Sequence, residues 1–114
     1  MDNTAAAPAI DLSYLHEYTG GDEEMIAELL ELFKESAEES FLDSKKSLQQ
    51  QDLQLWKMAA HKLKGAAGYV GAMQLRTLCA AAQNIEKLTF EEQSQSYDVI
   101  MKSYNEVCKM LEDR

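Results

Sequence analysis

The sequence predicts an all-α fold, an antiparallel up-down-up-down four-helix bundle with a short extra N-terminal helix. Three observations indicate it. The 114 residues include one proline and five glycines, so few residues interrupt helices. Apolar residues make up 46% of the chain and recur at helical spacing. The amphipathic stretches are long and are joined by short turns, as in bundles whose consecutive helices run antiparallel.

The element boundaries follow from the apolar stripes and from residues that favour helix ends. Asp52 is a good N-cap, and the glycines at 20–21 and at 71 favour helix termination. The expected helices span residues 11–18, 22–49, 53–70, 73–88 and 90–111. Residues 1–9 are expected to be a flexible tail, and residues 10–114 a single domain.

Composition excludes several classes of function. The net charge of −9 argues against a nucleic-acid partner, because phosphate backbones require a basic face. The chain has no apolar run of about 18 residues, so no membrane span is expected. Its first residues lack the basic and apolar regions of a secretion signal. Cys79 and Cys108 fall at apolar helical positions and are expected to be reduced, buried thiols. We expect a cytoplasmic monomer.

His61 is the most informative residue, because its helix should turn it away from the core. The apolar positions of 53–70 cluster within about 60° of Leu63 at roughly 100° per residue. His61 lies roughly 160° from Leu63, on the opposite face. The same outer face carries Gly65, Gly68 and Ala72, while Lys62 and Lys64 flank it. The pattern predicts an exposed imidazole on a strip of small residues between two ammonium groups.

The charges around His61 differ from those of the rest of the chain. Nine of the 20 acidic residues lie between Asp22 and Asp43, and none lies between Leu53 and Asn84. The second segment instead carries basic residues, which suits a phosphate or an acidic protein surface. The residues expected to contact a partner protein are Lys57, Met58, Lys62, Gly65, Gly68 and Ala72.

Gln83 is predicted to face His61. If the third and fourth helices fold back about Ala72, positions whose numbers sum to 144 lie level, which places 83 opposite 61. The Gln83 amide can then accept a hydrogen bond from the imidazole Nδ1–H group and leave Nε2 free. Lys64, three residues after His61, can reach an oxyanion carried on the ring.

Other roles for His61 fit less well. A half-buried structural histidine conflicts with the outward direction, and an exposed histidine without a role leaves two helix-weakening glycines on its face unexplained. A metal site lacks further ligands, since His16 is the only other histidine. A haem motif is absent. Acid–base catalysis on a small substrate would need a pocket that excludes water. The remaining interpretation is that His61 carries a chemical group and passes it to a partner protein.

At this point the sequence resembles the histidine-containing phosphotransfer (HPt) domain family of two-component phosphorelays. The family motif is His-x-x-Lys-Gly followed by small residues and a glycine at the helix end, and residues 61–72 read HKLKGAAGYVGA. The likeness covers roughly residues 10–112. It implies that His61 accepts the phosphoryl group, that Lys64 stabilises its oxygens and that Gly65 clears space for a receiver domain. Gln83 matches a position from which some members hydrogen-bond the imidazole.

The resemblance implies a phosphorelay intermediate rather than an enzyme. Its partners would be a response-regulator receiver domain and a hybrid sensor histidine kinase, with Mg²⁺ in the receiver and no cofactor on this chain. Ala66 and Ala67 replace a serine that is frequent in the family. The alternatives are a non-catalytic adaptor that sequesters a receiver, a phosphoacceptor domain of a hybrid or chemotaxis-type histidine kinase, a kinase dimerisation helix and a purely structural bundle.

Overall fold

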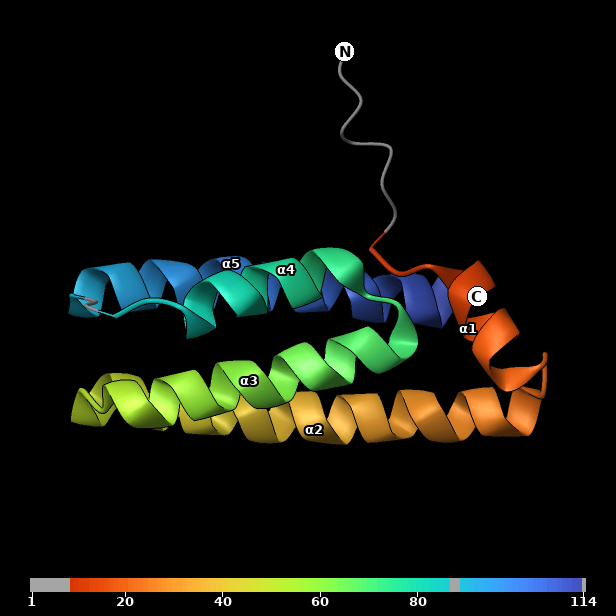
Figure 1. Cartoon of the computed structure of the whole chain (residues 1–114), viewed down its shortest axis with the longest axis horizontal. Coiled ribbons are helices and arrows are strands. Elements are labelled where there is room, and N and C mark those ends of the chain that lie inside the picture. Colours follow the sequence, from red (N-terminus) through yellow and green to blue (C-terminus); the bar gives the residue numbers. More distant parts are fainter. Residues whose placement is uncertain (1–8, 87–88, 114) are drawn as a thin grey trace, which may run out of the picture.

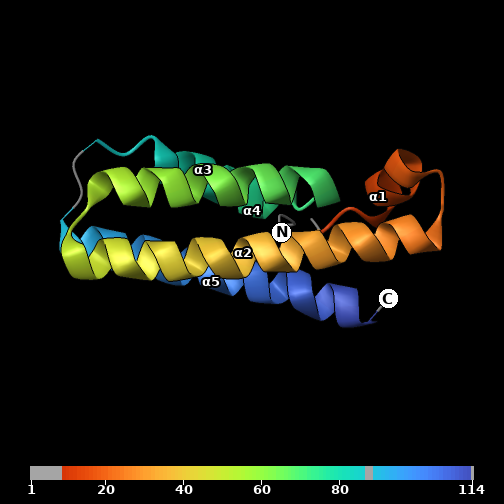
Figure 2. The same ribbon diagram turned by 90° about the horizontal axis from the view of Figure 1, so that it is seen from below.

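The described part of the chain is a helical bundle. The computed structural model describes residues 9–86 and 89–113, which form five α-helices and no strand. The helices are α1 (Leu12–Thr19), α2 (Glu23–Gln50), α3 (Leu53–Val70), α4 (Met73–Gln83) and α5 (Phe90–Asp113). In Figure 1, α2 to α5 run in alternating directions and α1 lies across one end. Figure 2 shows the same helices from below, with α3 in front of α4 and α2 in front of α5. The expected antiparallel bundle with an extra N-terminal helix is confirmed.

Aspartates begin the first three helices. The side chains of Asp11, Asp22 and Asp52 each accept a hydrogen bond from a backbone N–H in the first turn, at 3.1, 3.0 and 3.0 Å. Such caps satisfy amides that have no partner within the helix. The predicted start of α3 after Asp52 is therefore confirmed. The expected tail falls mostly on residues 1–8, outside the described residues, whereas Ala9 packs against the core.

Gly71 ends α3 and joins it to the N-terminal segment. Its φ is +77°, a left-handed conformation that favours glycine. A Cβ at this position would lie 3.0 Å from Cδ1 of Tyr14 and 3.1 Å from the carbonyl oxygen of Asp11. The Asp11 amide donates to the Gly71 carbonyl at 3.0 Å. Glycine is thus required both for the backbone angle and for the close approach.

The core lies between the helices and contains apolar side chains from α1 to α5. Its largest fully buried members are Trp56, Phe33, Ile10, Leu15, Ile26, Leu75, Val70 and Val107. Phe41 and Tyr104 add an aromatic contact between α2 and α5, with ring centroids 5.1 Å apart. The buried stripe on α3 holds that helix by one face and leaves the opposite face free.

The end of α4 was predicted wrongly. The apolar pattern indicated a helix to Leu88, but α4 ends at Gln83. The indole nitrogen of Trp56 donates to the Ala82 carbonyl at 3.1 Å. In a longer helix that carbonyl would accept from the amide of Glu86. Because Trp56 supplies the hydrogen bond instead, the chain can leave the helix just after Gln83 without leaving the Ala82 carbonyl unpaired.

Trp56→Phe is expected to lower the free energy of unfolding by about 1–3 kcal/mol, because it leaves the buried carbonyl of Ala82 without a donor. Urea unfolding followed by circular dichroism measures the change. The control is Tyr18→Phe, since Tyr18 is 55% exposed and its substitution should change stability by less than about 0.5 kcal/mol. Equal midpoints for Trp56→Phe and the wild type would show that this hydrogen bond does not stabilise the bundle.

Candidate functional site

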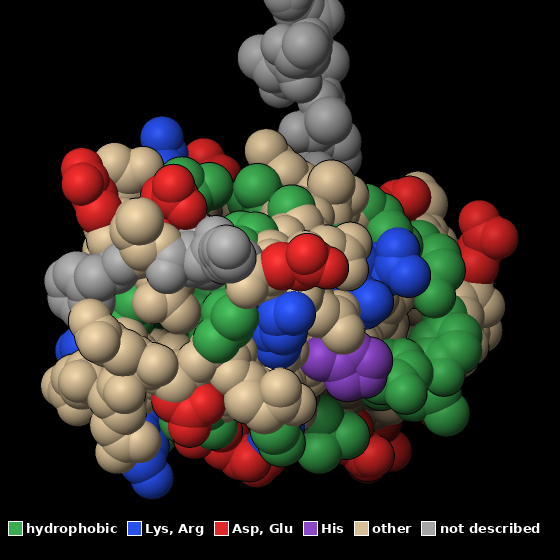
Figure 3. Space-filling model, turned by 60° about the vertical axis from the view of Figure 1, so that its left-hand side comes forward, with side chains coloured by type: hydrophobic (Ala, Val, Ile, Leu, Met, Phe, Trp, Pro, Cys, Tyr) green, Lys and Arg blue, Asp and Glu red, His purple; other side chains and the backbone are tan. Residues whose placement is uncertain are grey.

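His61 lies on the exposed face of α3, as predicted. The buried residues of this helix are Trp56, Ala59, Ala60, Leu63, Ala66, Ala67 and Val70. They form one stripe along the helix, and the side chain of His61 points away from it into solvent. The face of the bundle drawn in Figure 3 shows a histidine side chain at the surface, with Lys or Arg and hydrophobic side chains next to it. The imidazole is open to a partner molecule.

Gln83 contacts His61, as the level positions of α3 and α4 predicted. Its amide nitrogen lies 3.0 Å from imidazole Nδ1. With the amide in this orientation its nitrogen donates and Nδ1 accepts, which corresponds to the tautomer with hydrogen on Nε2. This direction is opposite to the one expected from the sequence. Rotating the amide by 180° presents its oxygen to an Nδ1–H group instead. Gln83 can therefore hold the ring in either tautomer.

The two lysines that flank His61 differ in their surroundings. Lys62 points toward α2 and forms an ion pair with Glu39. Lys64 is half-buried and lies on the flank of α3 away from Lys62. Burial raises the pKa of the Cys79 thiol to about 12, and the ammonium group of Lys64 opposes this rise. The Lys64 charge therefore lies near α4, and Cys79 stays protonated and unreactive. Of the two lysines, only Lys64 is without a carboxylate partner among the described residues.

The small residues expected to contact a partner have three different environments. Gly65 is exposed, and a Cβ there would meet nothing within 4 Å. Gly68 is half-buried, and a Cβ there would lie 3.5 Å from Cδ and from Nε of Arg76. Gly68, which was expected to contact a partner, thus lies beside a side chain of its own chain, while Gly65 leaves open space beside His61.

Ala72 was placed wrongly on the outer face. Its exposed fraction is 0%. The projection at 100° per residue does not apply beyond Val70, where α3 ends and the chain turns. The Ala72 amide donates to the Ala67 carbonyl at 2.9 Å, and its side chain belongs to the buried core cluster. Ala72 therefore cannot contact a partner.

The remaining residues of the expected docking surface are accessible. Met58 is 60% exposed and lies about one turn before His61. Lys57 is half-buried and lies in the first half of α3. Both are on the surface where the sequence placed them.

An apolar groove of about 520 Å³ lies beside His61 and Lys62 on the α2 side. Its apolar lining consists of Tyr18, Leu29, Leu32, Phe33, Ala66 and Tyr69. Leu32 and Tyr69 are 59% and 61% exposed, which is unusual for large apolar side chains that lie close together. Sequence reasoning missed this groove. The available signal was that Leu32 and Tyr69 are apolar but lie outside the core stripes of their helices.

Arg76 lies in the basic segment between Leu53 and Asn84, but it was not assigned to the site from the sequence. The position rule that placed Gln83 opposite His61 also pairs 76 with 68, and the structure shows that contact. Within residues 9–86 and 89–113, no group of three His, Cys, Asp or Glu side chains could hold a metal ion. The same residues contain no helix with the length and hydropathy of a membrane span.

Comparison with known proteins shows the family of the chain. The family model of the Hpt domain matches residues 28–113, which include His61, Lys64 and Gln83. The chain belongs to the Hpt domain family. The Hpt domain is 29% identical over 104 residues to the phosphorelay intermediate protein rdeA of Dictyostelium discoideum. That match covers 90% of the Hpt chain and 41% of the relative, so the chain corresponds to less than half of rdeA. No solved structure matches the chain significantly.

Proposed function

We propose that this Hpt domain is a cytoplasmic, monomeric carrier that moves a phosphoryl group between receiver domains on His61. The donor is an aspartyl phosphate on the receiver of a hybrid sensor histidine kinase, and the acceptor is the aspartate of a response-regulator receiver. The observation that carries the proposal is the exposed imidazole held at Nδ1 by Gln83. Nε2 has no hydrogen-bond partner among the described residues, so it can attack once the ring hydrogen is on Nδ1.

The chemistry is a transfer between two nucleophiles. The Nε2 lone pair attacks phosphorus, and the Nε2–P bond forms as the bond between phosphorus and the aspartate oxygen breaks. The aspartate leaves as a carboxylate, and the Nδ1 proton passes to solvent. Attack requires the tautomer with hydrogen on Nδ1, to which the Gln83 oxygen is the acceptor. In the neutral phosphohistidine, Nδ1 has a lone pair, to which the Gln83 amide nitrogen donates, as in the arrangement observed.

The charge of the phosphoryl group is offset from two sides. Lys64 lies one turn after His61 and supplies a cation from this chain. The receiver supplies an acidic pocket with Mg²⁺, which neutralises the oxygens during transfer. His61 has no enclosing pocket, so the reaction site is complete only when a receiver covers it. This chain is therefore a carrier without a cofactor of its own, and not an enzyme acting alone.

The surface around His61 fits such a partner. The groove between α2 and α3 offers apolar side chains to a helix with an apolar ridge. Gly65 lines the groove and has open space where a Cβ would lie, so a second backbone can come close to the imidazole, and the exposed Met58 one turn before His61 offers a further apolar contact. Apolar contacts next to a reactive group place the receiver aspartate against Nε2 before transfer.

The test uses the intact chain and receivers labelled with ³²P in the presence of Mg²⁺. Label is expected to move from the receiver to this chain, to be lost in acid and kept in alkali, and then to move to a second unlabelled receiver. Label that never leaves any receiver of the source organism would contradict the proposal.

The same assay separates the carrier from a non-catalytic adaptor. An adaptor would bind the receiver through the same groove, and the complex would be seen by sedimentation or calorimetry, but no label would move. The hydrogen bond between Gln83 and His61 favours the carrier, because an adaptor has no need of an oriented imidazole.

A further inference from the structure

We infer that Arg76 pairs with a carboxylate on the rim of the receiver's acidic pocket and thereby sets the direction in which the receiver lies across His61. This inference rests on the proposed function. It assigns a docking role to α4, which the motif around His61 does not include. It also predicts which side of His61 the apolar part of the receiver covers.

The surface around His61 has two unlike sides. The side toward α2 holds the apolar groove, with Leu32 and Tyr69 exposed. The side toward α4 holds polar and cationic groups, namely Gln83, Lys64 and Arg76. A partner with one apolar and one acidic region can match this surface in one direction only.

Arg76 lies where it can contact the acidic region of such a partner. Its Cδ and Nε atoms lie at van der Waals distance from the position that a Cβ on Gly68 would occupy. The arginine stem therefore lies beside α3 at Gly68, on the outer face that also carries His61, at a distance where a Cβ would make an ordinary contact with it. Arg76 is exposed, and among the described residues its guanidinium has no carboxylate partner. An arginine whose aliphatic part lies against a helix and whose guanidinium group is unpaired can bind a carboxylate with two N–H groups.

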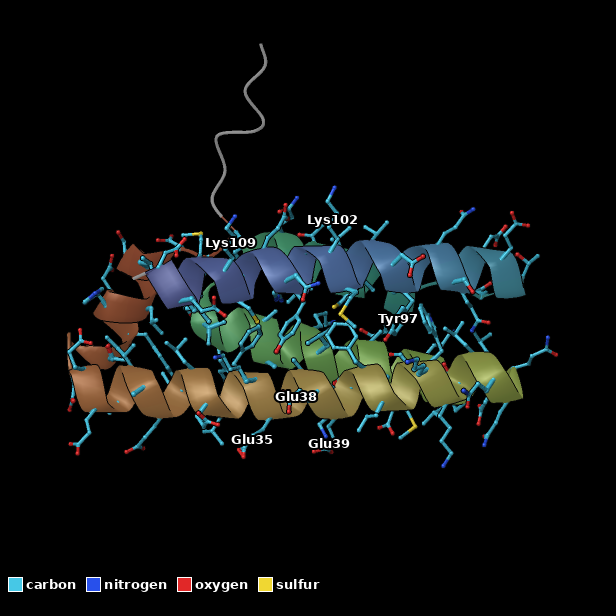
Figure 4. All side chains as sticks on the ribbon, turned by 180° about the vertical axis from the view of Figure 1, so that it is seen from behind. Glu35, Glu38, Glu39, Tyr97, Lys102 and Lys109 are labelled. Carbon is cyan, nitrogen blue, oxygen red and sulfur yellow. The ribbon has the colours of Figure 1, made fainter. Side chains whose placement is uncertain are left out.

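The side of the site toward α2 is not suited to bind the acidic rim of the receiver. Its cation, Lys62, is already paired with Glu39. Figure 4 shows Glu35 and Glu39 projecting from α2 away from the bundle. The carboxylate of Glu35, which has no ion-pair partner among the described residues, repels an acidic rim, whereas Arg76 and Lys64 attract it. The rim is therefore directed over α4, and the apolar ridge of the receiver over the groove between α2 and α3.

The test compares Arg76→Gln with wild type in transfer from a phosphorylated receiver, with initial rates measured over a range of carrier concentrations. KM is expected to rise about 5- to 10-fold with kcat within about twofold, because a rim contact affects docking more than chemistry. The difference should shrink in about 0.5 M NaCl, where charges on the surface are screened. The control Lys102→Gln removes one positive charge from α5, where Figure 4 labels it, and should leave KM unchanged.

A second measurement tests the direction. Asp and Glu residues around the receiver's pocket are replaced one at a time by Asn or Gln and combined with Arg76→Gln. One receiver position should lose its effect on KM in the Arg76→Gln background. An unchanged KM in Arg76→Gln, the same increase in Lys102→Gln, or a fall in kcat alone would overturn the inference. Label that still reaches His61 in these variants would leave the carrier function in place.

Discussion

His61→Gln is expected to abolish phosphoryl transfer to this chain while leaving the bundle folded. The imidazole supplies the nucleophilic nitrogen of the proposed transfer, and the glutamine amide that replaces it is not a nucleophile toward phosphorus. His61 is exposed and makes no core contact, so its replacement should change the free energy of unfolding by less than about 0.5 kcal/mol. The measurement is the ³²P assay, with urea unfolding of the same preparation.

His16→Gln is the matched control. His16 is the other histidine of the chain and is exposed near the end of α1. Its variant should accept label at the wild-type rate. Retained label in His61→Gln, or loss of label in His16→Gln, would show that His61 is not the phosphorylated residue. Binding of the receiver to unlabelled His61→Gln should persist, because the groove and the cations are intact.

The helices could be predicted because their signals are local. Apolar stripes place α2, α3 and α5, and the aspartate caps and Gly71 place the ends of α3 within one residue. The end of α4 depends on Trp56, 26 residues from the carbonyl that it satisfies. A hydrogen bond between helices is not visible in the pattern of one helix, so the sequence indicated a longer α4.

The candidate site also contains some features that the sequence could predict and others that it could not. The direction of His61 follows from the periodicity of α3, and the contact with Gln83 follows from a turn at a known position. The pairing of Lys62 with Glu39 joins residues 23 apart and depends on how α2 packs against α3. The groove likewise needs side chains from three helices in their packed positions. Ala72 was misplaced for a different reason. The projection at 100° per residue was applied beyond Val70, where α3 ends.

Lys64→Ala is expected to slow phosphoryl transfer about 10- to 100-fold and to shorten the lifetime of phospho-His61. Removing one donor to a developing oxyanion typically lowers kcat by about 10²–10³-fold. The smaller value applies here because Lys64 is partly exposed and Mg²⁺ of the receiver offsets part of the same charge. Rapid-quench measurement of transfer gives the rate, and decay of isolated phosphorylated carrier gives the lifetime.

Lys64→Arg and Lys57→Ala are the controls for this prediction. Arginine keeps the charge and should restore much of the rate, whereas Lys57, one turn before His61, should change docking by less than about threefold. The effect of Lys64→Ala should fall on kcat, and that of Arg76→Gln on KM, because one cation acts on the phosphoryl group and the other on the receiver rim. The double variant should then lose both factors multiplied together. A wild-type kcat in Lys64→Ala would remove Lys64 from the transfer step, and an effect on KM alone would place it with Arg76 in docking.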